Sequence, residues 1–236
     1  MKKKIGIIGG AGPMASCLLY QEIIRICQKS YSCQNDQDFP EIVIINYPFS
    51  NMLCMEDVQQ NKALLINELQ ECFNRLEQQK IDIAVIACNT LHTFLSDITT
   101  NIKILIEVDN VIAQYMKQQK LKKIAVFSTE TTIALGLYQK RCGANSIMYT
   151  NEQTKLTQVI NNILAGTVSD YEIDTFCTII EDLYQKSLFD GLVLGCTELS
   201  LIYEPVVQFL QKRFSNVTLI DTTRLLAQTV VQASFI

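Results

Sequence analysis

Short runs rich in isoleucine and valine alternate along the chain with longer stretches of helical periodicity, and this alternation constrains the fold more than any other feature. In the stretch 65–76, for example, apolar side chains recur at positions that share one face of a helix. Strands that are apolar along their whole length are typical of parallel sheets covered by helices on both faces. The sequence therefore predicts an α/β protein, with strands at Lys4–Ile8, Ile42–Asn46, Ile81–Ala87, Lys103–Val108, Lys123–Phe127, Ser146–Tyr149, Leu192–Gly195 and Val217–Ile220.

The composition favours a globular protein and disfavours several functional classes. The chain has 236 residues, of which 48% are hydrophobic and 19% are charged, so it is long enough for one large domain or two small lobes. Its formal net charge is −4 and its largest basic cluster is Lys2–Lys4, whereas a nucleic-acid-binding protein needs a basic face. We therefore expect no nucleic-acid partner, and no membrane span because no apolar run reaches about 18 residues. A single histidine disfavours the common zinc sites, so no metal site is predicted.

Nine cysteines without any Cys-x-x-Cys spacing point to a reducing compartment, and we predict a cytoplasmic location. The odd number leaves at least one thiol free, and the spacing disfavours zinc ribbons, iron–sulfur clusters and thioredoxin-type redox pairs. The basic and apolar N-terminus superficially resembles a signal peptide, but the apolar run stops at Gly9–Pro13, as in a strand followed by a turn.

A weak internal repeat indicates two related lobes. Lys3–Ile8 is similar to Lys122–Phe127, and Asp82–Thr90 is similar to Asp190–Glu198. In both copies of the second pair, an aspartate precedes a cysteine by six positions. Two matches in the same order predict a duplicated α/β lobe, with pseudo-two-fold symmetry and a cleft between the copies. We place the first lobe at residues 1–108 and the second at residues 109–215.

Cys88 and Cys196, the cysteines of this repeat, are the strongest candidates for catalysis. Each follows an apolar strand and precedes a helical segment, and open α/β sheets bind ligands at the carboxyl ends of their strands. A helix N-terminus beside each sulfur would favour the thiolate. Two opposed thiols suit racemisation, because one removes a proton from carbon while the other delivers a proton to the opposite face. A disulfide or peroxide reductase is the competing thiol chemistry, and core packing is the interpretation that we favour for the other seven cysteines.

Three further features have more than one interpretation. The glycine turn Gly9–Pro13 leads into a helix and is either a carboxylate-binding site or a plain β–α turn. Ser128–Thr132 occupies the matching position of the second lobe and either presents hydroxyls to a ligand or only caps a helix. His92 follows Cys88 by one helical turn, where it either tunes the thiol, binds a ligand or has a structural role.

Three motifs together resemble the aspartate/glutamate racemase family in content and order. They are Gly9–Pro13, Ala87–His92 and Gly195–Leu199, and the resemblance extends from Ile5 to Thr223. It implies a cofactor-independent amino-acid racemase that needs no pyridoxal phosphate, is often a homodimer and has two parallel-sheet lobes with the active site between them. It also implies that the C-terminal helix returns to the first lobe, so that residues 216–236 complete that lobe.

The resemblance also implies roles for individual residues. Cys88 and Cys196 would be the two catalytic bases. Apart from the resemblance, we expect the helical segment Glu56–Gln79 to be either a dimer interface or a surface helix of the first lobe. The residues expected at the substrate's carboxylate and ammonium groups are Gly10, Ala11, Asn89, Thr90, Thr129, Thr132, Thr197 and Glu198.

The chain departs from the family pattern where an acidic substrate would be bound. Family members that act on aspartate have an arginine shortly after the second strand and a lysine near residue 165. Here Tyr47–Cys54 contains no basic residue and Leu164 stands at the lysine position, while Glu107 and Asp109 are expected at the rim of the cleft. Burying an acidic side chain without a cationic partner is costly. We therefore expect the substrate to be a neutral or cationic amino acid.

Two other interpretations remain open. The same superfamily resemblance includes hydantoin racemases, maleate isomerases and malonate decarboxylases, although retention of both cysteines favours racemisation. The alternative outside enzymes is a catalytically inactive regulatory protein that binds an amino acid. Such a protein has no need for two thiols.

Overall fold

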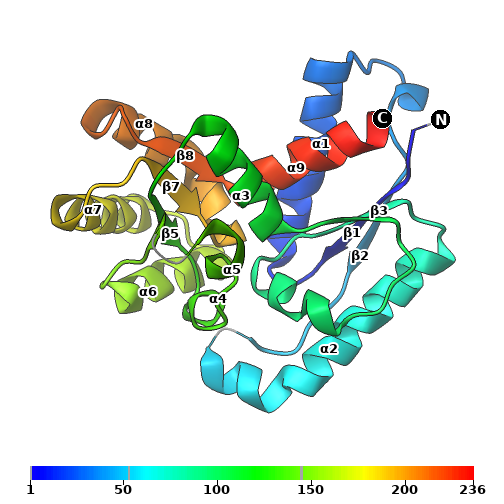
Figure 1. Ribbon diagram of the computed structural model, residues 1–236, viewed down its shortest axis with the longest axis horizontal. Coiled ribbons are helices and arrows are strands. Elements are labelled where there is room, and N and C mark those ends of the chain that lie inside the picture. The colour runs from blue at the N-terminus through cyan, green and yellow to red at the C-terminus, as the bar shows by residue number, and fades with distance from the viewer. Residues whose placement is uncertain (1, 53, 144–145) are drawn as a thin grey trace.

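The computed structural model describes residues 2–52, 54–143 and 146–236, and within them it confirms the predicted α/β class (Figure 1). Two four-stranded parallel sheets have the strand orders β2-β1-β3-β4 and β6-β5-β7-β8. Each predicted strand is present, with its ends within two residues of the prediction. The strands are β1 (Ile5–Gly9), β2 (Ile42–Asn46), β3 (Ile83–Ile86), β4 (Ile104–Ile106), β5 (Ile124–Phe127), β6 (Ile147–Met148), β7 (Gly191–Leu194) and β8 (Thr218–Asp221).

Helices cover both faces of the sheets, as whole-strand apolarity predicts (Figure 1). Successive side chains of a strand point to opposite faces. Along β3, Ile83 and Val85 therefore enter the core beside α1 and α9, whereas Ala84 and Ile86 enter the core beside α2. The helices are α1 (Pro13–Tyr31), α2 (Met55–Gln78), α3 (Val108–Gln119), α4 (Glu130–Ala134), α5 (Gln139–Cys142), α6 (Gln153–Leu164), α7 (Asp170–Lys186), α8 (Tyr203–Arg213) and α9 (Thr222–Phe235).

The internal repeat corresponds to the two sheets, strand for strand. In the first lobe, Asp82 Oδ2 accepts a hydrogen bond from the Lys4 backbone N–H at 2.8 Å. In the second lobe, the Asp190 carboxylate accepts from the N–H groups of Lys122 and Lys123 at 2.8 and 2.9 Å. The aspartate six positions before each cysteine thus binds the start of the neighbouring central strand. This shared contact explains the repeated aspartates and confirms the predicted pseudo-two-fold relation.

The C-terminal segment belongs to both lobes, which corrects the predicted assignment of residues 216–236 to the first. Strand β8 pairs in parallel with β7 and forms an edge of the second sheet, with Leu219 opposite Leu192. Only α9 packs on the first lobe, where the Lys3 N–H donates to the Ser234 carbonyl at 3.0 Å. The chain therefore crosses from one lobe to the other between β8 and α9.

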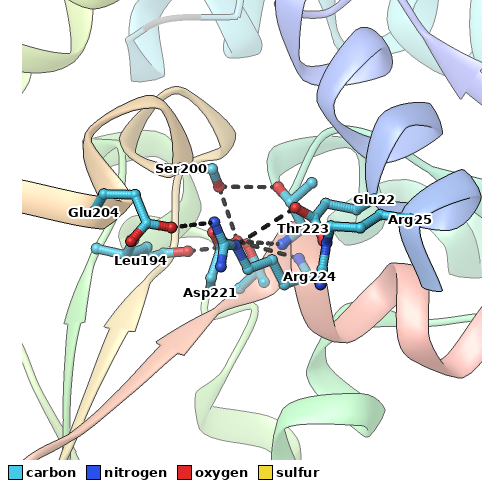
Figure 2. Close-up of polar contacts among 9 residues, drawn as sticks. Glu22, Arg25, Leu194, Ser200, Glu204, Asp221, Thr223 and Arg224 are labelled. Atoms are coloured by element: carbon cyan, nitrogen blue, oxygen red, sulfur yellow. Dashed lines mark hydrogen bonds and ion pairs between the residues drawn. The ribbon is translucent and has the colours of Figure 1, made fainter. Parts of the chain in front are cut away.

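A polar cluster holds this crossing in place (Figure 2). The Arg224 guanidinium of α9 bonds to Glu204 of α8 at 3.1 Å and pairs with Glu22 of α1 at 3.8 Å. Its Cζ atom lies 3.5 Å from the centroid of the Tyr203 ring. Asp221 caps α9 by accepting from the Thr223 N–H at 2.8 Å. The start of α9 is thus fastened to both lobes.

Helix α2 packs its apolar face on the first sheet and leaves its polar face exposed. The buried face consists of Val58, Leu65, Leu69, Cys72, Phe73 and Leu76. This packing is that of a surface helix of the first lobe, and the homodimer stays a prediction. No helix in the described ranges is both long and apolar enough to span a bilayer.

We expect truncation of Leu76 to be strongly destabilising, because this side chain is fully buried between α2 and the first sheet. Leu76→Ala should lower the free energy of unfolding by about 2–5 kcal/mol, the range for buried leucine-to-alanine changes. Urea unfolding followed by circular dichroism measures this. The matched control is Leu64→Ala on the same helix, where the side chain is 50% exposed. Equal losses in both variants would contradict this description of the core.

Candidate active site

A cavity of about 200 Å³ lies between the lobes, where the carboxyl ends of both sheets meet. The turns that follow β1, β3, β5 and β7 all contribute to it. Parallel pairing explains this arrangement, because strands that run in one direction release their turns at one edge of the sheet. Every site residue predicted from the sequence lines this cavity: Gly10, Ala11, Cys88, Asn89, Thr90, Thr129, Thr132, Cys196, Thr197 and Glu198.

Cys88 stands two residues after β3 and is only 8% exposed. The N–H groups of Thr90 and Leu91 hydrogen-bond towards its sulfur and favour the thiolate, as expected for a helix start. Burial has the larger and opposite effect, and it raises the pKa of the Cys88 thiol to about 12. The turn supplies the predicted donors, but desolvation outweighs them.

Cys196 stands two residues after β7 and is in direct contact with Glu198. Its thiol donates to Glu198 Oε2 at 2.9 Å, and the Thr197 hydroxyl donates to the same oxygen at 3.1 Å. Burial raises the pKa of the Cys196 thiol well above its usual value, and the neighbouring carboxylate raises it further. The neutral thiol of Cys196 is therefore favoured, and an acceptor for its proton is already in place.

Glu198 reaches across the cleft to the glycine turn of the first lobe. A Cβ atom at Gly12 would lie 2.1 Å from Glu198 Oε1, and Gly12 has a φ of +80°. Only glycine fits this position, because it needs neither space for a side chain nor a negative φ. The turn therefore accommodates a carboxylate from the other lobe, which is a role that the sequence did not reveal.

Gly10 shapes the same turn. Its φ is +100°, and a Cβ atom there would lie 2.0 Å from the Tyr47 carbonyl oxygen. Its N–H donates to Ser16 Oγ at 3.2 Å. Gly10 therefore lines the cavity with backbone, and its own N–H is used inside the protein.

Asn89 connects the two cysteine-bearing turns. Its Nδ2 group donates to the Gly195 carbonyl at 2.7 Å and to Thr222 Oγ1 at 3.1 Å. Both amide protons are thus used, and these acceptors set the orientation of the amide. The Asn89 Oδ1 atom is buried and has no hydrogen-bond partner among the described residues. Asn89 can accept a hydrogen bond from a ligand but cannot donate one in this arrangement.

Three threonine hydroxyls form a group at the other side of the cavity. Thr90 Oγ1 lies 2.8 Å from Thr132 Oγ1 and 3.4 Å from Thr129 Oγ1, and the latter two lie 2.9 Å apart. Thr129 is also the N-cap of α4, since its Oγ1 accepts from the Thr132 N–H at 3.3 Å. Both interpretations of the Ser128–Thr132 turn therefore apply, because the residues that cap the helix also line the cavity.

His92 is held by backbone carbonyls and is not among the residues that line the cavity. Its Nδ1 lies 2.9 Å from the Cys88 carbonyl oxygen and its Nε2 lies 3.4 Å from the Ile106 carbonyl oxygen. Burial lowers the pKa of the ring, so the neutral form is favoured. These contacts fit the structural interpretation, in which His92 joins the Cys88 turn to β4.

An apolar wall lines this cavity, and the sequence had pointed to the segment after β2 and to Leu164 only as places where basic residues are missing. Phe49 and Met52 come from the segment after β2, and Ile160 and Leu164 come from one face of α6. Two signals were available in the sequence. The segment after β2 leaves the sheet at the same edge as the glycine turn, and residues 160 and 164 are four apart on a helix.

The two acidic residues that were expected at the rim of the cleft lie outside the cavity lining. Glu107 and Asp109 both pair with Arg141, at 3.0 and 2.9 Å, and neither lines the cavity. The start of α3 and the end of α5 meet there, so Arg141 offsets part of the charge of the two carboxylates. Within the described part of the chain, Glu198 is the one charged side chain on the cavity surface.

Comparison with known proteins assigns the chain to a family. Residues 8–230 match the Asp/Glu/hydantoin racemase family. The chain belongs to that family. This membership confirms the predicted resemblance and the predicted enzyme class, an isomerase of the racemase type.

The similarity to individual relatives extends over nearly the whole chain. The broad specificity amino-acid racemase RacX of Bacillus subtilis is 25% identical, and the match covers 96% of each chain. The aspartate racemase of Picrophilus torridus has the same fold, with a TM-score of 0.81, 22% identity and coverage of 99% of this chain and 94% of that one. An aspartate racemase homologue from Pyrococcus horikoshii has a TM-score of 0.74 and 23% identity, with coverage of 99% and 100%.

We expect alkylation to report the raised pKa of Cys88. The rate of its modification by iodoacetamide should still be rising steeply between about pH 7 and pH 10, because only the thiolate reacts and burial keeps the pKa of the thiol near 12. Peptide mass spectrometry measures the rate at each cysteine. The exposed Cys17 serves as the internal control and should be modified first. A Cys88 rate that levels off near neutral pH would show that the thiolate is favoured at rest after all.

Proposed function

We propose that this protein racemises α-amino acids in the cavity between its lobes, with Cys88 and Cys196 as opposed acid and base, and that it prefers neutral or cationic side chains to acidic ones. The observation that carries the proposal is the meeting of two buried thiols, from corresponding strands of the two lobes, on the surface of one cavity. The groups around them suit the ammonium and carboxylate that every amino acid has.

The proposed reaction begins with neutral thiols. Glu198 takes the proton of Cys196, to which it is already hydrogen-bonded. The Cys196 thiolate then removes the α-proton of the substrate, and the Cys88 thiol delivers a proton to the opposite face of the carbanion. Cys196 ends as a thiol and Cys88 as a thiolate, which is the form ready for the other enantiomer. Proton exchange with solvent restores the starting form.

The polar groups of the cavity can bind the charged groups of the substrate. Asn89 Oδ1 is buried without a partner, and it would accept from the substrate ammonium. The hydroxyls of Thr90, Thr129 and Thr132 now bond to one another, and each can turn its proton to a carboxylate. An ammonium beside the thiols would also favour the thiolate, which offsets the effect of burial on the thiol pKa values.

The lining of the cavity supports the preference for a side chain that is not acidic. Leu164, Ile160 and Met52 offer no charge to a carboxylate, and Glu198 repels one. The broad specificity named for RacX, the relative that covers 96% of this chain, agrees with a substrate range beyond acidic amino acids.

Proton exchange in D₂O tests the proposal. Each proteinogenic amino acid is incubated with the reduced protein, and loss of the α-proton is followed by NMR and inversion by chiral chromatography. We expect inversion of neutral amino acids, with Cys88→Ser and Cys196→Ser each about 100- to 10,000-fold slower, the usual contribution of a positioned acid or base. Cys177→Ser is the control, since Cys177 lies on α7 away from the cavity.

Each of the other results has a definite meaning. Inversion confined to aspartate and glutamate would overturn the side-chain preference and keep the mechanism. Binding of an amino acid without any exchange would support the regulatory protein instead. Exchange that survives in the double variant Cys88→Ser/Cys196→Ser would rule out the two thiols.

We expect a cation at position 164 to shift the substrate range. Leu164→Lys places an ammonium on the apolar wall, so the activity with aspartate or glutamate relative to neutral amino acids should rise by about 10-fold, equivalent to about 1.4 kcal/mol. The measurement is kcat/KM for both classes of substrate. Leu188→Lys adds the same charge at a side chain that is 69% exposed and outside the cavity, and it should leave the ratio unchanged.

A further inference from the structure

We propose that Thr222, the first residue of α9, is a positioning residue that sets the placement of the two thiols relative to each other. This inference rests on the proposed two-thiol racemisation, and it concerns a residue that does not line the cavity. The observation that supports it is a buried hydroxyl that hydrogen-bonds both to the turn that contains Cys88 and to strand β7, which precedes Cys196.

The Thr222 hydroxyl hydrogen-bonds to both lobes, because it donates to one lobe and accepts from the other. Its Oγ1 donates to the Leu194 carbonyl at 2.9 Å and accepts from Asn89 Nδ2 at 3.1 Å. Asn89 directly follows Cys88, and Leu194 precedes Cys196 by two residues. The second amide proton of Asn89 goes to the Gly195 carbonyl at 2.7 Å. The three bonds form a closed bridge between the segments that carry the two sulfurs.

The bridge is rigid because its surroundings leave it little freedom. Thr222 is fully buried and Asn89 is 3% exposed, so water does not compete for these bonds. The backbone of Thr222 is fixed by its neighbours in sequence, since Asp221 caps α9 and Arg224 is bonded to α8 (Figure 2). The hydroxyl therefore sits at a fixed point of the crossing between the lobes.

A misplaced pair of thiols has a specific consequence for two-base racemisation. One thiol alone can remove the α-proton, exchange it with solvent and return a deuteron to the same face. Inversion requires the other thiol to meet the opposite face of the same carbanion. Loosening the bridge should therefore slow inversion more than exchange, whereas a loss of folded protein lowers both in the same proportion.

The test is the ratio of α-proton exchange to inversion in D₂O, with a neutral amino acid that the wild-type protein inverts. Thr222→Val keeps the shape of the side chain and removes the hydroxyl. We expect kcat for inversion to fall by about 10- to 100-fold, since a displacement of about 1 Å costs about 100-fold. The exchange-to-inversion ratio should rise by at least about 3-fold, and KM should change little.

Two variants separate positioning from packing. Thr222→Ser keeps the hydroxyl and removes only the methyl group, so its exchange-to-inversion ratio should match that of the wild-type protein. Thr229→Val removes a hydroxyl from the same helix that bonds only to the Leu225 carbonyl at 2.9 Å, and it should leave the ratio unchanged. Thr222→Ala removes the hydroxyl without adding any atom, and it carries the same expectation if the valine variant does not fold.

A parallel loss of exchange and inversion in Thr222→Val and Thr222→Ala would overturn the proposal, as would failure of Thr222→Ser to restore the ratio. The result is distinct from failure of the proposed function itself. If the wild-type protein neither exchanges nor inverts any amino acid, the two-thiol mechanism is wrong and the role of Thr222 falls with it. If the wild-type protein inverts an amino acid and the exchange-to-inversion ratio is the same in the Thr222 variants, only the role of Thr222 is wrong.

Discussion

All strand pairing in the two described sheets is parallel, so the turns that follow β1, β3, β5 and β7 leave their sheets at the carboxyl edges. The lobes meet along those edges, and the cavity, the thiols and the interlobe hydrogen bonds all follow from that arrangement. The sides of the sheets are covered by helices, which removes the other surfaces from contact with a ligand. Chemistry between the lobes is therefore carried by short turns on rigid strands.

Opposing electrostatic effects meet at these turns. Backbone N–H groups favour a thiolate at Cys88, and burial opposes it with a larger effect that raises the pKa to about 12. At Cys196 burial and the Glu198 carboxylate act in the same direction on the thiol pKa. In the proposed mechanism, a cationic ammonium group would activate this pair of neutral thiols, and the Glu198 carboxylate would take the proton of Cys196. The amino acid would then be both the substrate and part of the electrostatic environment.

Contacts between lobes decide more of the site than contacts within them. Asn89 reaches Gly195, Thr90 reaches Thr132, and Glu198 packs on Gly12. Each of these pairs joins residues that are at least 42 positions apart in the chain. The crossing between β8 and α9, held by Arg224, keeps the partners in reach of one another.

The sequence by itself determined the α/β class and the eight strands, because apolar periodicity is a local signal, whereas the polar residues expected at the cavity came from the family resemblance of three motifs. It also pointed to the cysteine pair, whose equivalence follows from the repeat. Only the tertiary structure decided that β8 completes the second sheet, that Glu107 and Asp109 pair with Arg141, and that α6 supplies an apolar wall. It also decided that burial outweighs the backbone donors in setting the pKa of the Cys88 thiol. These outcomes depend on burial and on which distant segments meet, and such quantities arise only when the two lobes pack together.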